Sequence, residues 1–386
     1  MNCPSPCRPW LCLIVATLAG IGVPLQAGAQ TALAPRAQTR GLSRGWAALE
    51  AGRFDDAVSV ARAALKAFPA DHGAVVLEME ALAQSGQVAA AFEAYQNWSS
   101  KHPRGDASLT AIVAVAVLRA LGASASPLAV RVAALKTLAE AGDAASRDAL
   151  SALGPSARLD AAETLAALGD ASAASALVGA IQDTQGSRKL AAMAAAARVH
   201  APGAAEAISP MTTDRDPAIR AGAAAALGEL KNPASADSLV ALLKDPMPAV
   251  NGSAAIALAR MGRPEGDAVL SQMLESGVPD IVLMAAEGLP SQPERWRSAV
   301  EPLLRTESPI DRLRAARLLK EFDSSAASQA VSAALADSNP AVREEASRAL
   351  ADMGALDGGV DWPRLLTDSS PSVRLGAAQA LMRESQ

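Results

Sequence analysis

One phrase recurs along the last two-thirds of the chain. It reads "PAIRAGAAAALG" at 217–228, "NPAVREEASRALADMG" at 339–354 and "PSVRLGAAQALM" at 371–382. Aligned on the residue after the branched aliphatic position, it gives nine anchor positions, spaced 27, 31, 31, 31, 31, 30, 31 and 31 residues apart. The anchors are Arg131, Arg158, Lys189, Arg220, Asn251, Val282, Arg312, Arg343 and Arg374. A constant period of this length indicates a repeat architecture, in which each unit buries its apolar face against the next.

Each unit is expected to be a helical hairpin. The third residue after the anchor is Ala in all nine units, and the seventh is Leu in eight of them. These offsets fall on one face of a helix. Pro at 217, 248, 279, 309, 340 and 371 marks the first turn of that helix, and Asp216, Ser338 and Ser370 are expected to cap it. A second apolar segment follows in each unit, as at 236–245 and 328–337.

Composition agrees with helices throughout. Half of the chain is hydrophobic but only 3% is aromatic, and Ala, which supplies much of the apolar content, is the best helix former. The sequence therefore predicts an all-α fold, a right-handed α-solenoid of stacked helical hairpins, with about nine units over 127–386.

The hairpins resemble HEAT-like repeats in the short form found in phycobilisome-lyase-type proteins. The resemblance implies that an anchor Arg pairs with an Asp of a neighbouring turn. Asp216, Asp337 and Asp368 are the expected acceptors. The alternative is a solvated series of charges that adds little stability. The expected structural ladder comprises Arg131, Arg158, Arg220, Arg312, Arg343 and Arg374.

A second, smaller set of repeats precedes the array. The stretches 52–69 and 86–103 align without gaps, with Gly52 and Gly86, Ala57 and Ala91, and Pro69 and Pro103 each 34 residues apart. This pattern resembles the tetratricopeptide repeat, which implies two such repeats over 38–103. A strongly apolar helix is expected within 104–126, bridging the repeats to the array.

The N-terminus reads as a targeting segment. An apolar run of thirteen residues follows Arg8, and Ala27 and Ala29 form a small-residue cleavage pattern. We therefore expect a signal peptide at 1–29, then a disordered linker at 30–37. The alternative is an uncleaved anchor, for which the apolar run is short.

The mature chain would contain no cysteine, since Cys3, Cys7 and Cys12 all lie in the leader. The formal net charge of −5, with acids and bases interspersed, argues against nucleic acid as a partner. These features predict an exported protein, periplasmic or secreted, with no stable membrane span after cleavage.

No constellation of catalytic residues stands out. The three histidines, His72, His102 and His200, have no metal-ligand spacing. In HEAT-like proteins that hydroxylate a modified lysine, His-Glu pairs bind iron, and no His here precedes a Glu. The sequence thus predicts no catalytic residue, no metal and no cofactor.

The expected function is that of a non-catalytic scaffold or adaptor that binds protein or peptide partners along a concave surface, which we expect the second helices to line. The alternatives are an accessory protein of the HEAT-like lyase type, acting on a cofactor-bearing or protein substrate, and a regulatory subunit in envelope assembly. The pattern breaks between 251 and 300, where Asn251 and Val282 replace the anchor Arg. The candidate partner surface comprises Trp46, Asp237, Lys244, Gln272, Trp296, Arg297 and Glu301.

The chain ends after the first helix of the ninth unit. A terminal unit normally needs a polar outer face, and Arg374, Gln379, Arg383 and Glu384 would supply a partial one. The final helix is therefore expected to be a weakly protected edge or a docking site.

Overall fold

The structure, a computed structural model, describes residues 36–102, 107–123, 126–153, 158–289, 292–354, 356 and 359–384. The expected signal peptide, 1–29, and the linker up to residue 35 lie outside this range. The described residues form helices, turns and loops and contain no strand, so the all-α prediction is confirmed. Within them, no helix is both long enough and apolar enough to cross a lipid bilayer.

The chain divides into two compact units, and the division differs from the sequential one expected. Unit 1 takes in the chain as far as Arg147 and again from Asp337 onward, whereas unit 2 runs from Asp148 to Ala336. The last repeats therefore group with the N-terminal ones.

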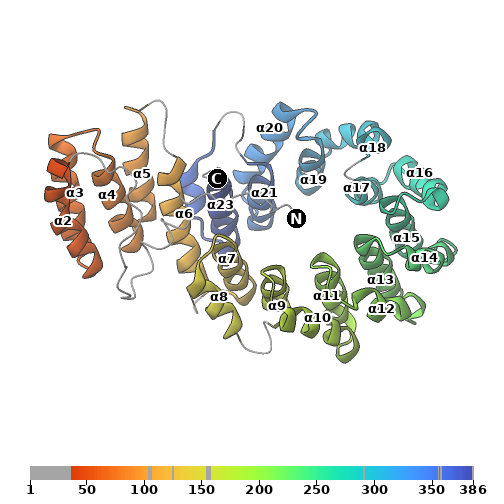
Figure 1. Ribbon diagram of the computed structural model, residues 1–386. Helices are drawn as coiled ribbons and strands as arrows, with labels where there is room; N and C mark the ends of the chain where they lie inside the picture. Colours follow the sequence, from red (N-terminus) through yellow and green to blue (C-terminus); the bar gives the residue numbers. More distant parts are fainter. Residues whose placement is uncertain are drawn as a thin grey trace. The chain divides into compact units, whose positions relative to one another are not determined.

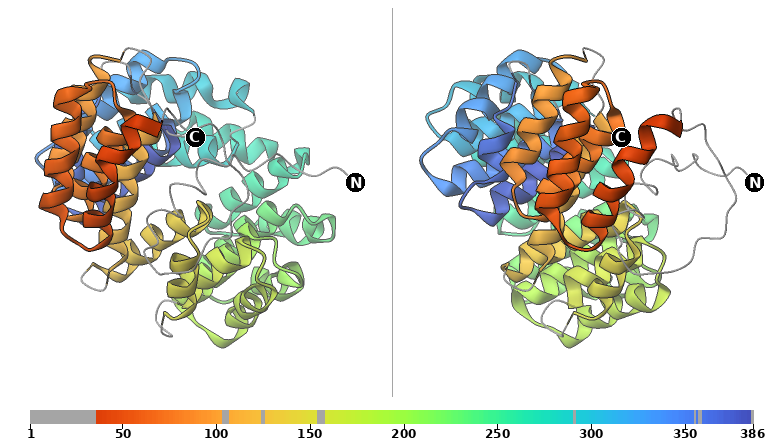
Figure 2. Two further views of the ribbon diagram at one scale, coloured as in Figure 1. Left: turned by 60° about the vertical axis from the view of Figure 1, so that its left-hand side comes forward. Right: turned by 90° about the vertical axis from the view of Figure 1, so that its left-hand side faces the viewer.

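Unit 1 begins with antiparallel helices that correspond to the two short repeats, shown at the front of the right-hand view in Figure 2. The first helix already includes residues 36 and 37, which corrects the expected linker. Unit 1 contains α2 (Arg36–Glu50), α3 (Phe54–Ala67), α4 (His72–Gln84), α5 (Val88–Ser99), α6 (Ala107–Gly122), α7 (Leu128–Glu140), α21 (Pro340–Met353), α22 (Trp362–Leu366) and α23 (Pro371–Glu384), and α8 (Ala144–Ser151) spans the division.

Unit 2 is a stack of hairpins in two layers (Figure 1). Its first-helix layer contains α9 (Arg158–Ala167), α11 (Gly186–Arg198), α13 (Pro217–Leu230), α15 (Pro248–Arg260), α17 (Pro279–Gly288) and α19 (Pro309–Leu319). Its second layer contains α10 (Ala171–Asp183), α12 (Ala204–Ile208), α14 (Ala236–Leu242), α16 (Asp267–Glu275), α18 (Pro293–Val300) and α20 (Ser324–Leu335), with short 3₁₀ turns at Ser209–Thr213, Pro233–Ser235, Pro264–Gly266 and Glu301–Arg305.

The repeat positions decide what is buried. The Ala three residues after each anchor is buried in every unit, from Ala134 to Ala377. The residue seven after the anchor is buried in all units except at Leu165, which is half-buried. Small Ala side chains let adjacent helices approach, and the Leu fills the space behind them.

The helix caps partly differ from those expected. Asp216 caps α13 through the backbone N–H of Ala218 at 2.8 Å, as the pattern suggested. For α21 the cap is Asn339, whose side chain accepts from Ala341 N at 3.0 Å, and not Ser338. The residue directly before the Pro occupies the N-cap, and Ser338 lies one position too early.

The final helix is not an edge. α23 packs against α21 on one side and against α6 and α7 on the other (Figure 1). Val373, Ala377 and Leu381 are fully buried, and Gln379 Nε2 donates a hydrogen bond to Thr137 Oγ1 at 2.9 Å. The expectation of an uncovered outer face is therefore wrong, because a helix some 250 residues earlier in the chain covers it.

Gly228 marks a close crossing of α13 and α15 and permits a test. A Cβ at this position would lie 2.5 Å from the Cβ of Ala257 and 2.6 Å from its Cα. Because the obstacle is backbone, Gly228→Ala must push α13 and α15 apart, and we expect it to lower the free energy of unfolding by about 1–3 kcal/mol. Gly179→Ala in α10, where nothing lies within 4 Å, is the matched control and should raise it by up to about 1 kcal/mol. Urea unfolding compares the two, and equal stabilities would contradict the crossing.

Candidate partner-binding surface

Each of four anchor arginines donates hydrogen bonds to the loop that precedes its own helix. Arg343 Nη1 donates to the backbone carbonyls of Asp337 at 3.0 Å and Ser338 at 3.1 Å, six and five residues earlier. Arg220, Arg312 and Arg374 make the same pair of contacts. The anchor therefore holds the turn that leads into its own helix.

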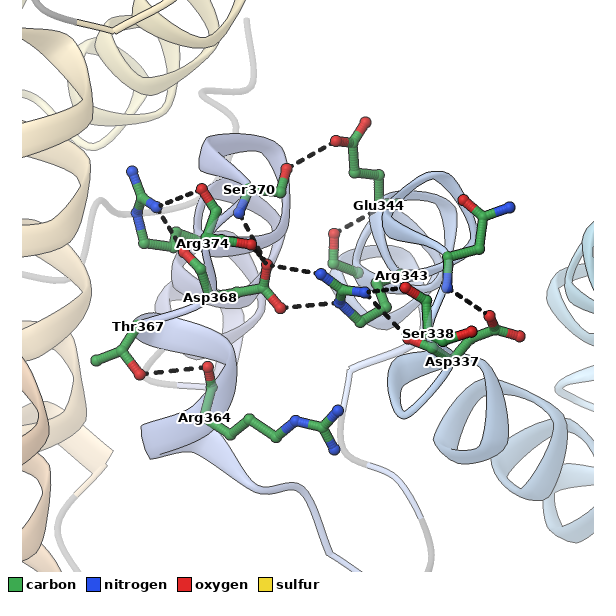
Figure 3. Close-up of polar contacts among 12 residues, drawn as sticks. Asp337, Ser338, Arg343, Glu344, Arg364, Thr367, Asp368, Ser370 and Arg374 are labelled. Carbon is green, nitrogen blue, oxygen red and sulfur yellow. Dashed lines mark hydrogen bonds and ion pairs between the residues drawn. The ribbon is translucent and has the colours of Figure 1, made fainter.

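Two anchor arginines also bind a side chain of the next repeat. Arg343 forms a bidentate ion pair with Asp368, at 2.9 and 3.2 Å, as Figure 3 shows. Arg220 pairs in the same way with Asp245, at 2.7 and 3.0 Å, and not with Asp216. The acceptor lies 25 residues after the anchor because the Asp of the following loop faces it, whereas Asp216 is engaged as a cap.

Each paired Asp also organises its own loop. Asp245 Oδ1 accepts the backbone N–H of Met247 at 2.9 Å, and Asp368 Oδ1 accepts that of Ser370 at 2.8 Å. The hydrogen bond from Arg220 holds the pKa of the Asp245 carboxyl below its ordinary value, and the N–H of Met247 adds to this. The signal for these residues was present in the sequence, since an Asp stands six residues before the anchor at Asp214, Asp245, Asp337 and Asp368.

The remaining ladder positions differ. Arg131 Nε is buried without a hydrogen-bond partner among the described residues, and the side chain of Arg158 lies outside them. In the irregular units, Asn251 Nδ2 reaches the Asp245 carbonyl at 3.3 Å, while Val282 offers no donor. The structural ladder of anchor arginines is therefore interrupted at these two repeats.

In unit 2 the first helices, not the second, lie on the concave side (Figure 1). The expectation that second helices line this surface is therefore wrong. The close approach permitted by the invariant Ala shortens the spacing between first helices, and the larger second-helix side chains spread the other layer.

Ion pairs between neighbouring repeats of unit 2 cross this first-helix face. Arg198 of α11 binds Glu163 of α9 at 2.8 and 2.7 Å. Arg260 of α15 donates to Glu229 of α13 at 3.0 Å and to the Gly288 carbonyl of α17 at 2.8 Å.

The next junction along the face is tied in the same manner. Arg314 of α19 binds Glu287 of α17 at 2.8 and 2.9 Å and Asp280 at 2.9 Å. The two repeats in which Asn251 and Val282 replace the anchor Arg are thus held to their neighbours by ion pairs across the concave face.

A pocket of about 220 Å³ opens on this face between α13, α15 and α17. Ile256 and Met284 are half-buried at its wall. At its rim, Arg260 is paired with Glu229, and Glu287 is paired with Arg314. Apolar walls with fixed polar groups at the rim suit the recognition of a side chain. The pocket is lined by Ala225, Ser253, Ile256, Ala257, Arg260, Met284, Glu287 and Gly288.

Sequence reasoning missed this pocket although a signal existed. Two and five residues after the anchor, α11 and α13 carry only Ala or Gly, as at Ala191 and Ala225. The same positions hold Ile256 in α15 and Met284 in α17. Large apolar residues at first-helix positions that hold Ala or Gly in α11 and α13 therefore mark the pocket.

The candidate surface predicted from the sequence is not one patch. Trp296 is only 2% exposed, its Nε1 donates to the Leu289 carbonyl at 2.8 Å, and its ring meets Phe322 edge-on. A large aromatic ring stabilises most when buried with its donor satisfied, so Trp296 is a core residue and its assignment to the surface is wrong. Arg297 and Glu301 are exposed and pair with each other at 2.6 Å.

The other members are dispersed. Trp46 is half-buried in unit 1, whereas the rest lie exposed on the second layer of unit 2, away from the concave face. These are Asp237, Lys244 and Gln272.

Two of the three histidines lie around one tryptophan. The His102 ring stacks on Trp98 with centroids 4.3 Å apart, and His72 meets the same ring edge-on at 5.9 Å. Within the described part of the chain, no group of three or more His, Cys, Asp or Glu residues is placed to hold a metal ion.

Comparison with known proteins agrees with the repeat architecture. A family model of HEAT repeats matches residues 204–289 and 298–360. A model of the bacterial transcriptional activator domain matches residues 27–101. The chain is thus a helical repeat protein with HEAT repeats between 204 and 360. No curated protein matches it.

Two solved structures show distant likenesses. Human deoxyhypusine hydroxylase, in complex with glycerol, is 19% identical over 72% of this chain and 97% of its own, with a TM-score of 0.33. A crystal structure of an engineered protein is 19% identical over 81% of this chain and 96% of its own, with a TM-score of 0.27. At such TM-scores the likenesses carry no argument.

Proposed function

We propose that this helical repeat protein is a non-catalytic scaffold that binds a protein partner on the concave first-helix face of unit 2. The pocket between α13, α15 and α17 carries the proposal. It interrupts a face otherwise covered by small side chains and by ion pairs, which admit a partner backbone at close range.

The pocket fits one apolar side chain of a partner segment. Met284 is adaptable in shape, and Ile256 offers a branched wall. Arg260 and Glu287 are held by other residues before any partner arrives, so their ordering adds little to the cost of binding. An apolar side chain seated in such a pocket is typically a dominant contact of an interface.

Filling the pocket is expected to weaken partner binding. Ala225 lies exposed beside it, so Ala225→Phe places a ring in the space without removing any buried group. Loss of one well-seated side chain weakens binding by about 1–3 kcal/mol, which is roughly a 5- to 150-fold rise in Kd. Cross-linking and affinity purification from the native envelope identify the partner, and titration of the purified partner measures the Kd.

The matched control is Ala241→Phe, at an exposed Ala of α14 in the second layer. It should leave the Kd unchanged. A partner lost with Ala241→Phe but retained with Ala225→Phe would refute the assignment to the concave face. Protein purified from its own host with a bound chromophore or metal would instead favour an accessory protein of the lyase type.

We also infer the type of each repeat. The alignment at 34 residues, the left-handed backbone at both Gly52 and Gly86, and the complete burial of Ala57 and Ala91 support tetratricopeptide-like repeats at the N-terminus. The 31-residue period supports the short, phycobilisome-lyase-type form of the HEAT-like array.

Export is proposed on the leader sequence alone. The apolar run and the Ala27–Ala29 pattern support cleavage after Ala29 and a periplasmic or secreted scaffold. N-terminal sequencing of the protein from the exported fraction tests this, and an intact Met1 in the soluble fraction would refute it.

A further inference from the structure

The final helix joins its two neighbours by different chemistry. Toward α21 its ties are polar and numerous. The loop that precedes it carries Asp368, which pairs with Arg343, and Ser370 Oγ donates to Glu344 Oε1 at 2.7 Å (Figure 3). The packing there is also tight, since a Cβ at Gly376 would lie 2.6 Å from Ser347 Oγ and 2.7 Å from the backbone of Ser347.

Toward α6 the contact is apolar. α6 is buried nearly all round, with Leu109, Val113 and Leu118 fully inaccessible. A helix that is apolar on every side must be covered on every side. α4, α5 and α7 cover part of α6, and α23 covers the rest. α22 also packs against α5. We call the contact of α23 with α6 and α7, together with that of α22 with α5, the seam.

The seam joins two segments that are far apart in the chain. Everything between Asp148 and Ala336 belongs to unit 2, so the halves of unit 1 are connected only through 189 residues of another compact unit. When unit 1 opens, the polar ties keep α23 on α21, and the break falls along the seam.

We propose that the seam is exchangeable, and that a second copy of this chain is the partner that fits it. An opened chain exposes two complementary apolar faces, one on α6 and one on α23. In a swapped dimer, α23 of each copy covers α6 of the other with the same contacts as in the closed monomer. This is an isologous, closed arrangement, which domain swapping produces at little cost in contacts.

The balance between the two forms depends on concentration. The contacts are equal, so the closed monomer is favoured by the effective concentration of its own tethered half, which is on the order of millimolar or below for so long a connection. Refolding at high protein concentration should therefore trap a dimer. That dimer should persist after dilution, because its return requires the seam to open again.

Single-cysteine variants test the exchange. In a full-length chain with Cys3, Cys7 and Cys12 changed to Ser, Thr137→Cys and Gln379→Cys place thiols on either side of the seam, at side chains that hydrogen-bond at 2.9 Å. The two variants are mixed, unfolded and refolded together across protein concentrations from micromolar to near-millimolar. The dimer is isolated by size exclusion and treated with a short bismaleimide.

The expected result is a dimer fraction that rises with concentration and a covalent link between Thr137→Cys of one chain and Gln379→Cys of the other. The doubly substituted chain, linked within the closed monomer before unfolding, should return only as a monomer. Formation of that link also shows that the substituted chain is folded.

A second pair tests where the break falls. Glu344→Cys and Ser370→Cys lie on α21 and at the start of α23, which travel together in the proposal. Mixed as single variants, they should give no link between chains. Monomer alone at every concentration, a dimer without the Thr137–Gln379 link, or a dimer linked through positions 344 and 370 would each overturn the proposal.

Discussion

Removing residues 371–386 is expected to destabilise unit 1 on both sides of the lost helix. The deletion exposes Leu350 and Leu366 of the preceding hairpin, and it also uncovers α6 on the opposite side. Burying a side chain such as Leu381 contributes about 1.5–3 kcal/mol, and the deleted helix buries three large apolar side chains and four Ala or Gly residues. The sum is comparable to the whole stability of an ordinary domain, about 5–15 kcal/mol.

Hydrogen exchange followed by mass spectrometry is the informative measurement. Loss of α23 should increase exchange in 107–122 as well as in 340–366, and the melting temperature should fall. Two substitutions provide matched versions of the experiment. Leu381→Ala, at a fully buried site, should cost about 2–5 kcal/mol, whereas Arg383→Ala, two residues on and exposed, should cost little. A truncated chain whose α6 exchanges as slowly as before would show that α23 does not cover it.

The second large effect concerns a carboxyl group buried in α4. Glu80 is only 4% exposed, and burial raises its pKa from 4.5 to about 7, with Arg119 of α6 opposing the rise. Arg119 also pairs with Asp143 at 3.3 Å, so its charge is shared between two carboxyl groups.

The raised pKa makes unit 1 less stable as the pH increases. Below about pH 4.5 Glu80 is protonated in both the folded and the unfolded chain, and its ionisation does not affect the stability. Between pH 4.5 and 7 the unfolded chain releases the proton while the folded chain retains it, so the free energy of unfolding falls. Over the whole interval the loss is about 3 kcal/mol, and above pH 7 it remains constant.

Glu80→Gln removes this penalty. The variant should match the parent near pH 4.5 and exceed it by about 3 kcal/mol at pH 8, as measured by urea unfolding at several pH values. Comparison of the two chains cancels the contributions that they share. Glu78→Gln is the control, since Glu78 lies on the same helix and bonds Arg62 at 2.7 Å. Parallel pH profiles for Glu80→Gln and the parent would contradict the raised pKa of Glu80.

Local pattern determined a large part of this protein. The register of the repeat identified the buried Ala and Leu of the units, because both offsets are fixed by the helical period alone. Pro at the start of the first helices located their N-termini, since its missing N–H is tolerated there. The all-round apolarity of α6 could also be read directly, and it required neighbours on every side.

Contacts between neighbouring repeats could be predicted from the sequence only in part. The Asp six residues before the anchor repeats as visibly as the Arg, yet the partner of Asp245 and of Asp368 is the Arg of the preceding repeat. That pairing depends on the path of the loop and not on the helical period. The burial of Trp296 and the pocket beside Met284 likewise depend on how three successive hairpins meet.

Tertiary structure alone decided the rest. Which helix layer lies on the concave side of unit 2 follows from the relative spacing of the two layers, a small difference that accumulates from unit to unit. The cover of α6 by α23 joins segments some 250 residues apart that share no repeat position. A periodic sequence specifies each hairpin and its next neighbour, and the meeting of α6 and α23 in unit 1 lies beyond what nearest neighbours encode.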